Sequence, residues 1–453
     1  MRQDLAMKYA LSLLGLLLVL PLLATAANDK TNVLFILVDD MGYGDLACYG
    51  APDVKTPHID QLAAQGVRFS QYYANGAECT PTRTALLTGR YPQRVKGLEC
   101  AIGTGNVGRY DDAIAVAAEH QLGLQATEAI LPRAFKDGGY ATGIFGKWHL
   151  GYEPQFHPKQ YGFDEFFGIL GGNCDYFTHR EFSEIPVLMR QGAPVKEEGY
   201  LTHMITTEAL GFMDKHKDEA FFLYVPYTTP HFPFQTPADA DNKSWTEENF
   251  SKGTRESYVT MLEDMDDAVG QLLARLETHD LAENTLVIFG SDHGGMGPSR
   301  NFPYRGSKGG LFEGGIRTAM MARLPKQLPV GEVSDQPCMT ADFTYSLARM
   351  AGASNKDLSR LDGMDILKHV ASDRANTPRT LYWRARRGDR TWKAIRHGAW
   401  KYIHKVEGGE EQAWLFDLAS DPEETHSRLD KSDTQRLGLI ALLAGWEAEM
   451  TRP

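Results

Sequence analysis

Several short apolar segments of the chain are each followed at once by a polar loop. Asn32–Val38, Phe221–Val225 and Thr285–Phe289 are almost continuously apolar, as is typical of strands buried on both faces of a parallel sheet, and Tyr140–Phe145 is a further predicted strand. Because the carboxyl ends of parallel strands meet at one edge of an open sheet, the loops that follow them should lie side by side. The sequence therefore predicts an α/β fold, with a large, mostly parallel sheet flanked by helices and functional residues at that edge.

Acidic side chains follow two of these strands. Asp39 and Asp40 come directly after the first strand, and two adjacent carboxylates are costly to bury unless a cation neutralises them. Asp292 and His293 repeat the arrangement after Thr285–Phe289, although imidazole is a less usual ligand than oxygen for calcium. A solvated, glycine-rich turn would suit the first pair equally well. The residues alone leave both interpretations open.

Basic side chains follow the other two strands. Lys147 and His149 come after Tyr140–Phe145, and in an extended chain they would point to the same side, because side chains alternate. His231 comes after Phe221–Val225, between two prolines that restrict the backbone around it. Surface-loop residues and a structural histidine are the ordinary alternatives, so the pattern alone assigns these positions no role.

A cysteine stands before a predicted helix that begins near residue 80. Thr80 can cap this helix, Pro81 suits its first position and Gly89 suits its end. Cys79 would then lie beside a helix N-terminus, which favours anions, and Arg83 would return to it after one turn. This arrangement suits a nucleophile that acts on an anionic group. The local features alone nevertheless favour a buried cysteine before an ordinary helix.

The segment Cys-x-Pro-x-Arg from Cys79, followed by Leu-Thr-Gly-Arg, resembles the signature of the type I sulfatases, a branch of the alkaline phosphatase superfamily. Asp39-Asp40, Gly146–Gly151, Asp292-His293 and Gly306–Gly309 follow the pattern of the same family in the expected order. Thr82 stands where many members have serine. In this family a formylglycine-generating enzyme oxidises the cysteine to formylglycine, whose hydrated aldehyde is the nucleophile. The resemblance covers nearly the whole chain and implies an alkaline phosphatase-like fold.

The resemblance implies a sulfuric ester hydrolase that releases inorganic sulfate. The hydrate attacks sulfur, cationic side chains neutralise the sulfate oxygens, His231 or Lys308 helps to protonate the leaving alcohol, and His149 removes the proton whose loss expels sulfate. The implied catalytic residues are Cys79, Arg83, Lys147, His149, His231 and Lys308. The implied ligands of a calcium ion are Asp39, Asp40, Asp292, His293 and the residue formed from Cys79.

The expected substrate is a sulfated carbohydrate. The segment Gly-Leu-Glu-Cys at 97–100 and the predicted export of the chain resemble bacterial enzymes that desulfate polysaccharides such as carrageenan. Side chains of two loops could hydrogen-bond sugar hydroxyls or pair with a further sulfate, although ordinary loop roles are about as plausible. These candidate substrate-binding residues are Asn173, Asp175, Tyr176, Arg300, Tyr304 and Arg305.

Other functions are compatible with parts of the pattern. An aryl or alkyl sulfatase, or a phosphodiesterase or phosphonate hydrolase of the same superfamily, would share the sheet and the metal. A cysteine hydrolase would use Cys79 unmodified and would be inactivated by thiol-alkylating reagents. A non-enzymatic glycan-binding protein is disfavoured, because every catalytic position of the family pattern is present.

The N-terminus has the pattern of a secretory signal over residues 1–26, with an early charged part, a short apolar core and a small-residue cleavage site. The apolar run is too short for a stable membrane anchor. We therefore expect an exported protein, periplasmic or extracellular. The formal net charge of −12 argues against a general nucleic-acid binder. Apart from Cys79, the chain has four cysteines, Cys48, Cys100, Cys174 and Cys338, which could be bridged or free.

The pattern changes after residue 352, and a polar stretch at 372–379 suggests a boundary. We expect a catalytic domain at 27–375 and a C-terminal α+β subdomain at 376–453, with short antiparallel strands and a closing helix from Gln435 to Met450. Within the first domain, Tyr258–Leu276 is a predicted amphipathic helix. Its acidic run from Glu263 to Asp267 is interpreted as a solvated face, and His58 as a structural residue.

Overall fold

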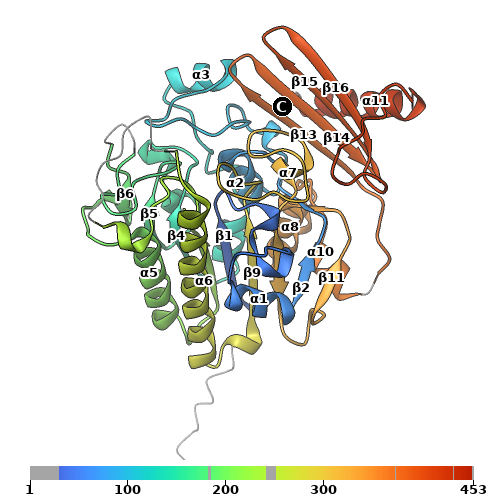
Figure 1. Cartoon of the computed structure of the whole chain (residues 1–453). Coiled ribbons are helices and arrows are strands. Elements are labelled where there is room, and N and C mark those ends of the chain that lie inside the picture. The colour runs from blue at the N-terminus through green and yellow to red at the C-terminus, as the bar shows by residue number, and fades with distance from the viewer. Residues whose placement is uncertain (1–29, 182–184, 241–250, 373, 432, 451–453) are drawn as a thin grey trace, which may run out of the picture.

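The computed structural model describes residues 30–181, 185–240, 251–372, 374–431 and 433–450, so the predicted signal segment at 1–26 lies outside the described residues. A ten-stranded sheet crosses the molecule with helices on both faces, which confirms the predicted fold class (Figure 1). Its strands, in spatial order, are β11 (Glu332–Ser334), β2 (Val67–Phe69), β10 (Met320–Arg323), β9 (Thr285–Ser291), β1 (Asn32–Val38), β8 (Phe221–Pro226), β4 (Ala141–Lys147), β5 (Glu165–Ile169), β6 (Leu188–Arg190) and β7 (Ala193–Pro194).

The centre of this sheet is parallel. The consecutive strands β9, β1, β8, β4 and β5 all run in one direction, whereas β10 and β6 pair antiparallel with the outer members β9 and β5. Every residue of β1, β4, β8 and β9 is buried, as the nearly continuous apolar runs predict. The loops after these four strands therefore leave the sheet at a common edge.

Alternate residues of β1 pack into separate cores on the two faces of the sheet. Val33 and Phe35 belong to the core on one face, and Leu34 and Ile36 belong to the core on the other. The first face is covered by α2 (Cys79–Thr88), α4 (Leu131–Asp137) and α8 (Thr340–Met350), and the second by α1 (Pro57–Ala64), α5 (Leu201–Lys215) and α6 (Arg255–Thr278).

A four-stranded antiparallel sheet and one helix form the C-terminal part of the chain, as predicted (Figure 1). The strands are β13 (Thr380–Arg387), β14 (Arg390–His397), β15 (Trp400–Glu407) and β16 (Glu410–Asp417), and the helix is α11 (Asp433–Met450). Tyr382 stacks on Trp446 of α11, while the next residue, Trp383, donates a hydrogen bond of 2.8 Å to the Ala74 carbonyl beside the large sheet. The small sheet therefore lies between its own helix and the rest of the molecule.

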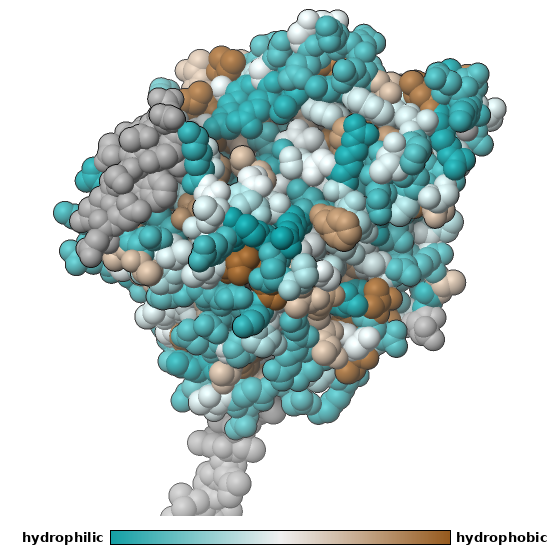
Figure 2. Space-filling view, in the orientation of Figure 1, coloured by the Kyte–Doolittle hydropathy of each residue, from teal (hydrophilic) through white to brown (hydrophobic). Residues whose placement is uncertain are grey.

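The remaining elements are short. They are α3 (Asp111–Ala118), α7 (Glu313–Ile316), α9 (Asn355–Leu358), α10 (Ile366–Ala371), the strand pair β3 (Tyr72–Tyr73) and β12 (Cys338–Met339), and 3₁₀ helices at Tyr43–Asp45, Ala47–Tyr49, Pro92–Arg94, Pro154–Phe156, Pro158–Tyr161, Pro237–Asp239 and Ala282–Asn284. Figure 2 shows that hydrophilic residues cover most of the described surface on the side it presents, with hydrophobic residues in small separate groups.

The helix that carries the cysteine starts earlier than predicted. Glu78, not Thr80, is its N-cap residue, and Cys79 is already the first helical residue. The Thr80 hydroxyl donates to the His149 carbonyl at 3.0 Å and accepts from the Ile102 amide at 3.1 Å, so it joins two loops rather than capping. Gly89 ends the helix in the left-handed conformation with φ of 67°, as predicted for a residue without a Cβ.

The acidic run of α6 is not uniformly solvated, which corrects one prediction. Asp266 is buried, and its carboxylate accepts hydrogen bonds from the backbone amides of His58 and Ile59 at 3.1 and 2.8 Å. It thereby satisfies two of the amides that the first turn of α1 leaves without partners. The five cysteines all lie in the described part of the chain and are free. Among the described residues, no helix is both long and apolar enough to cross a membrane.

Candidate active site

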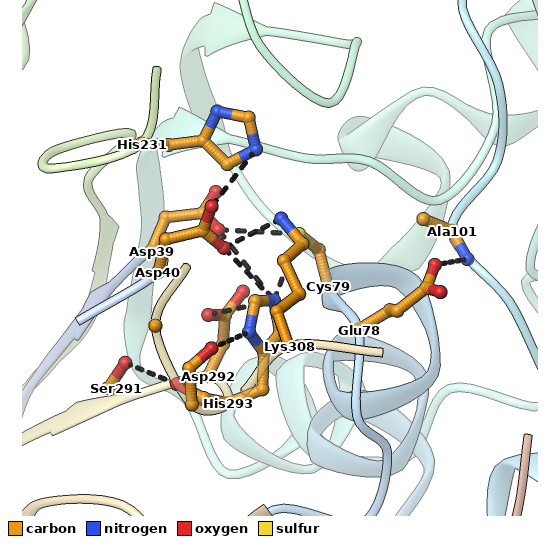
Figure 3. A network of polar contacts seen from close by, with 12 residues as sticks. Asp39, Asp40, Glu78, Cys79, Ala101, His231, Ser291, Asp292, His293 and Lys308 are labelled. Carbon is orange, nitrogen blue, oxygen red and sulfur yellow. Dashed lines mark hydrogen bonds and ion pairs between the residues drawn. The ribbon is translucent and has the colours of Figure 1, made fainter. Parts of the chain in front are cut away.

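Four adjacent strands of the large sheet deliver polar side chains to the same edge. Asp39 and Asp40 follow β1, and Lys147 ends β4, with His149 two residues beyond it. His231 lies beyond β8, and Asp292 and His293 follow β9. The helix α2 begins at this edge, so its first residue, Cys79, lies among these side chains (Figure 3).

The sulfur of Cys79 is the point toward which the site converges. Asp39 Oδ1 lies 3.3 Å and His293 Nε2 3.2 Å from this buried Sγ. The ammonium groups of Lys147 and Lys308 lie 3.2 and 3.7 Å from it. Burial and the Asp39 carboxylate favour the neutral thiol, but the two lysines outweigh them and lower the pKa of Cys79. The position of Sγ is therefore one at which negative charge is stabilised.

Three buried carboxylates and one imidazole form an acidic cluster beside this sulfur. Asp39, Asp40, Cys79 and His293 offer ligand atoms that all lie within 4.8 Å of one another, and Asp292 Oδ1 is 3.4 Å from His293 Nε2. Asp40 Oδ2 and Asp292 Oδ1 are buried without a hydrogen-bond partner among the described residues. Such orphaned carboxylate oxygens are the ligands that a hard divalent cation prefers.

Two groups of this cluster have raised pKa values, for different reasons. Burial works against charge on His293, but Asp292 and the Cys79 sulfur outweigh it and raise its pKa to about 10. Burial raises the pKa of Asp40 to about 7, Lys308 opposes this shift, and the neighbouring Asp39 adds to it. Burial opposes charge on Asp39, but Lys147 and other cations outweigh it and hold the pKa of Asp39 well below its usual value. The negative charge that raises the pKa of His293 and the orphaned carboxylate oxygens together fit a divalent metal ion.

Each carboxylate also has a cationic partner from the protein. Lys147 donates a hydrogen bond to Asp39. Lys308 donates to Asp40 Oδ1 at 2.6 Å (Figure 3). The Arg83 guanidinium, buried one helical turn from Cys79, donates to Asp292 Oδ2 at 3.2 Å and to the Lys147 carbonyl at 2.9 Å. Arg83 therefore holds together the ends of β4 and β9.

His149 has a backbone conformation that the extended-chain prediction did not anticipate. Its φ is 59°, so the chain turns there and Lys147 and His149 are not placed by simple alternation. The ring Nε2 lies 2.9 Å from the Ile102 carbonyl, which fixes the proton on Nε2, and Nδ1 is buried without a partner in the described structure. Burial, and then Lys147, hold the pKa of His149 well below its usual value, so Nδ1 carries an available lone pair.

His231 is oriented by its own loop. Its Nδ1 lies 2.7 Å from the Phe232 carbonyl and so carries the proton, while Nε2 faces Asp40 Oδ2 at 3.5 Å. The Tyr176 hydroxyl donates to the His231 carbonyl at 3.0 Å and supports the loop from behind. Burial, and then Lys308, lower the pKa of His231 well below its usual value.

A cavity of about 520 Å³ opens above these side chains. Cys79, His149, His231 and Lys308 lie on its wall, which places the carboxyl edge of the parallel strands in contact with the cavity. The cavity is much larger than one sulfate group and lies in the size range of small-molecule sites. Further charged and polar residues on its wall are Glu78, Thr104, Arg109, Asn173, Arg387, Arg390 and Glu407.

A family model described as Sulfatase matches residues 31–353, which is more than half of the chain. This chain belongs to the sulfatase family. It is a type I sulfatase of the alkaline phosphatase superfamily, and thus a sulfuric ester hydrolase. The sulfatase is 33% identical over 405 residues to the N-acetylgalactosamine-6-sulfatase of Canis lupus familiaris, with 83% of this chain and 72% of that protein covered. It is 28% identical over 516 residues to the steryl-sulfatase of Rattus norvegicus, with 89% and 86% covered.

Solved structures agree with this assignment. The sulfatase resembles the crystal structure of Ps i-CgsB in complex with k-i-k-neocarrahexaose, with a TM-score of 0.80, 30% identity and 92% of each chain covered. A phosphonate monoester hydrolase of Agrobacterium radiobacter shares the fold, with a TM-score of 0.63, 20% identity and 93% and 96% of the two chains covered.

The predicted substrate-binding residues have different positions. Of the first loop, Asn173 lines the cavity, whereas Asp175 caps the amides of Phe177 and Thr178, and Tyr176 is buried behind His231. The second loop lies elsewhere: Arg300 pairs with Asp53, Tyr304 packs on Tyr43, and Arg305 lies over the ring of Phe312. Five of these six side chains are therefore occupied within the fold, and none of the five is on the cavity wall.

Sequence reasoning missed the charged residues that do line the cavity. Arg387 and Arg390 come from the C-terminal sheet, and Arg109 comes from the loop before α3. The run Arg-Ala-Arg-Arg-Gly-Asp-Arg from Arg384 to Arg390 was the available signal, because a dense basic cluster across a turn is unusual in an acidic chain.

Proposed function

We propose that this sulfatase removes sulfate from a sulfated carbohydrate, a polysaccharide or oligosaccharide such as carrageenan. The observation that carries the proposal is a polar cavity of about 520 Å³ that leads down to Cys79 and its two lysines. The names of its relatives support it, since one is called an N-acetylgalactosamine-6-sulfatase and another was crystallised with a neocarrahexaose. A small aryl sulfate would leave most of such a cavity empty.

The proposed nucleophile is formylglycine at position 79. Cys79, Pro81 and Arg83 form the motif that the generating enzyme would modify before folding, since all three are buried in the folded chain. The Cys79 Sγ then stands in for a hydroxyl oxygen of the hydrated aldehyde. The hydrate supplies one hydroxyl that attacks sulfur and a second hydroxyl through which sulfate can be released.

The proposed metal is calcium, held by the acidic cluster. Asp39, Asp40, Asp292 and the residue formed from Cys79 would supply oxygen ligands, and His293 Nε2 would complete the set. A bound divalent cation lowers the pKa of a hydroxyl group that contacts it. His293 is the unusual member, because calcium prefers oxygen to imidazole.

The side chains of the protein prepare the site for an anion. Lys147 and Lys308 lie beside the position of the reacting atom, where their charges would neutralise sulfate oxygens and reduce the repulsion that an attacking oxyanion meets. Arg83 adds positive charge one turn along α2, and its hydrogen bonds hold Asp292 close to the end of β4. Together these groups make the local potential at Cys79 positive within an acidic protein.

His149 and Lys308 are suited to opposite proton transfers. His149 has its proton fixed on Nε2, so the unpartnered Nδ1 would accept the proton whose removal releases sulfate. Of His231 and Lys308, the two residues expected to help protonate the leaving alcohol, His231 has a lowered pKa and carries its single proton on Nδ1, bonded to a backbone carbonyl. Lys308 would therefore deliver this proton. Lys308 carries its proton at neutral pH, because Asp40 and the Cys79 sulfur outweigh the effect of burial and raise its pKa.

We further propose that the protein is exported and that residues 27–375 and 376–453 are its two domains. The signal pattern at 1–26 supports export, and a polysaccharide substrate would be met outside the cytoplasm. Cleavage after residue 26 in an expressing bacterium, detected by N-terminal sequencing of exported protein, would test this.

Sulfate release from a substrate panel tests the proposed function. The panel comprises carrageenans, fucans, ulvan, glycosaminoglycans, small aryl sulfates and matched phosphate esters, with inorganic sulfate or phosphate quantified by ion chromatography. We expect the highest kcat/KM on a sulfated oligosaccharide or polysaccharide. Turnover restricted to aryl sulfates would refute the carbohydrate substrate, and faster hydrolysis of the matched phosphate ester would assign the chain to a different reaction.

A further inference from the structure

Three arginines form a basic cluster on the cavity wall, at a distance along the chain from the catalytic residues. Arg387 and Arg390 are the last residue of β13 and the first residue of β14, and they face each other across a tight turn. The amide of Gly388 in this turn donates a hydrogen bond of 2.7 Å to the carbonyl of Arg109. The contact joins the C-terminal sheet to the loop that carries the third arginine, so all three line one cavity.

Two arginines of the cluster, Arg109 and Arg390, differ from the neighbouring Arg384 and Arg386 in how they are paired. Arg384 binds Glu99 through two hydrogen bonds of 2.7 and 2.8 Å, and Arg386 binds Glu99 at 3.0 Å. By contrast, the guanidinium groups of Arg109 and Arg390 have no hydrogen bond or ion pair with any residue in the described part of the chain. Of the three arginines on the cavity wall, Arg109 and Arg390 are therefore available within the described structure, whereas Arg387 is paired with Glu78.

The two carboxylates on the same wall do not cancel this charge. Glu78 accepts hydrogen bonds from the Ala101 amide at 2.9 Å and from Arg387 at 3.1 Å, so it is already neutralised (Figure 3 shows the contact with Ala101). Glu407 forms an ion pair with Lys405 beside it on β15. Among the described residues, two guanidinium groups without a partner therefore remain on the cavity wall, in a chain with a net charge of −12.

The cluster lies next to the catalytic lysine and yet is separate from the residues around Cys79. The Arg390 Nη2 atom is 3.6 Å from the position that a Cβ on Gly309 would occupy, and Gly309 directly follows Lys308. The sulfate under attack would be held by Lys147 and Lys308, which contact Cys79. An anion bound by the arginines would therefore belong to another part of the same substrate.

We propose that Arg109, Arg387 and Arg390 form a second anion subsite, which binds a sulfate or carboxylate group on a sugar next to the one being desulfated. Planar guanidinium groups bind both kinds of anion through paired hydrogen bonds. The inference rests on the proposed function and extends it: the preferred substrate carries at least two anionic groups. It also gives the C-terminal sheet a role in choosing the substrate.

Matched oligosaccharides test the subsite. Three oligosaccharides with the same scissile sulfate would be compared, whose neighbouring sugar is neutral, sulfated or a uronate. In the wild-type enzyme we expect kcat/KM to be higher for one or both of the dianionic substrates than for the neutral-neighbour substrate. The dianionic substrate with the higher kcat/KM shows whether the subsite prefers a sulfate or a carboxylate group. The ratio of dianionic to neutral-neighbour kcat/KM should fall about tenfold or more in Arg390→Gln, and further in Arg109→Gln/Arg390→Gln, because charge-assisted contacts are lost.

A surface arginine provides the control. Arg300 pairs with Asp53 and does not line the cavity, so Arg300→Gln removes the same charge and should leave the ratio unchanged. Equal ratios in the wild type, Arg390→Gln and the double variant would overturn the subsite. If the wild-type enzyme releases no sulfate from any of the three oligosaccharides, the proposed function fails instead, so the two failures are distinguishable.

Binding without turnover gives a second readout. The Cys79→Ala protein lacks the residue that is modified, and titration calorimetry would measure its affinity for a hexasaccharide of carrageenan sulfated on adjacent sugars. We expect Arg390→Gln in this background to weaken binding about tenfold or more, and salt to weaken the parent more than the variant. Equal affinity and equal salt dependence in the two proteins would contradict the proposal.

Discussion

Replacing Asp40 by asparagine should remove most of the stabilisation that we expect a bound calcium ion to give this sulfatase. Asp40 is buried beside Asp39 and His293, and its Oδ2 has no partner among the described residues. The substitution keeps the size of the side chain and removes one negative charge from the acidic cluster. It therefore isolates the contribution of charge to metal binding.

The expected magnitude follows from the size of the chain and of the charge. A ligand present at 100 times its Kd stabilises the folded state by about 2.7 kcal/mol. Roughly 400 described residues give an unfolding entropy of roughly 0.85 kcal/mol/K, so calcium at that level should raise Tm by about 3 °C. Loss of one unit charge about 4 Å from the ion costs about 3 kcal/mol or more, which raises Kd at least about 100-fold. The same calcium concentration should then shift Tm by only about 0.5 °C.

Differential scanning calorimetry with chelated and calcium-loaded protein would measure both shifts. Asp53→Asn is the matched control, because Asp53 pairs with Arg255 and Arg300 outside the cavity and offers no atom to the cluster. This control should keep the full calcium shift. An Asp40→Asn protein with the wild-type shift, or a wild-type protein that neither calcium, magnesium nor manganese stabilises, would refute the assignment of the metal site.

Three further predictions concern buried carboxylates that do not line the cavity. Burial raises the pKa of Glu424 from 4.5 to about 7, although Lys401 opposes this, so the stability that protonated Glu424 contributes is complete below pH 4.5 and is lost as pH rises through 7. Urea unfolding at several pH values should show that Glu424→Gln removes a pH dependence of the unfolding free energy of up to about 1.4 kcal/mol per pH unit. The same pH dependence in wild type and variant would contradict this. Asp266→Ala should lower the free energy of unfolding in the same assay by about 2–4 kcal/mol, because it leaves two backbone amides of α1 without partners. A decrease below about 0.5 kcal/mol would mean that water replaces the carboxylate. Glu99→Gln should lower the free energy of unfolding by about 3 kcal/mol, because it breaks the buried pairing with Arg384. It should also reduce kcat/KM more on a dianionic oligosaccharide than on an aryl sulfate. Equal losses of kcat/KM on the two substrates would show that Glu99 does not affect substrate preference.

The parallel core and the convergence of its loops were predictable from local sequence. Continuous apolar runs specify strands buried on both faces, and an open parallel sheet has only one carboxyl edge. Residues as distant as Asp39 and Asp292 therefore meet there, where both pair with Arg83. The family pattern then supplied Arg83 and Lys308, for which local physics gives no strong signal. The roles of these residues remain predictions.

Contacts between distant segments were not predictable in the same way. In the sequence, Asp266 is one of several acidic residues on a polar helix face. Only the packing of α1 on α6 brings its carboxylate to the N-terminal amides of α1, 208 residues away in the sequence. Asp175 and Asn173 look alike in a loop sequence, yet one is used within its own turn and the other lines the cavity. Arg390 reaches the cavity only because the C-terminal sheet folds back over it.

The most direct test of the account is whether sulfate release depends on formylglycine at position 79. Protein would be made with and without a formylglycine-generating enzyme, and peptide mass spectrometry would give the fraction of residue 79 that is aldehyde rather than thiol. We predict that kcat for a sulfated oligosaccharide rises in proportion to this fraction and that Cys79→Ala is inactive. Release of sulfate at an undiminished rate by protein whose Cys79 is entirely thiol would contradict the account.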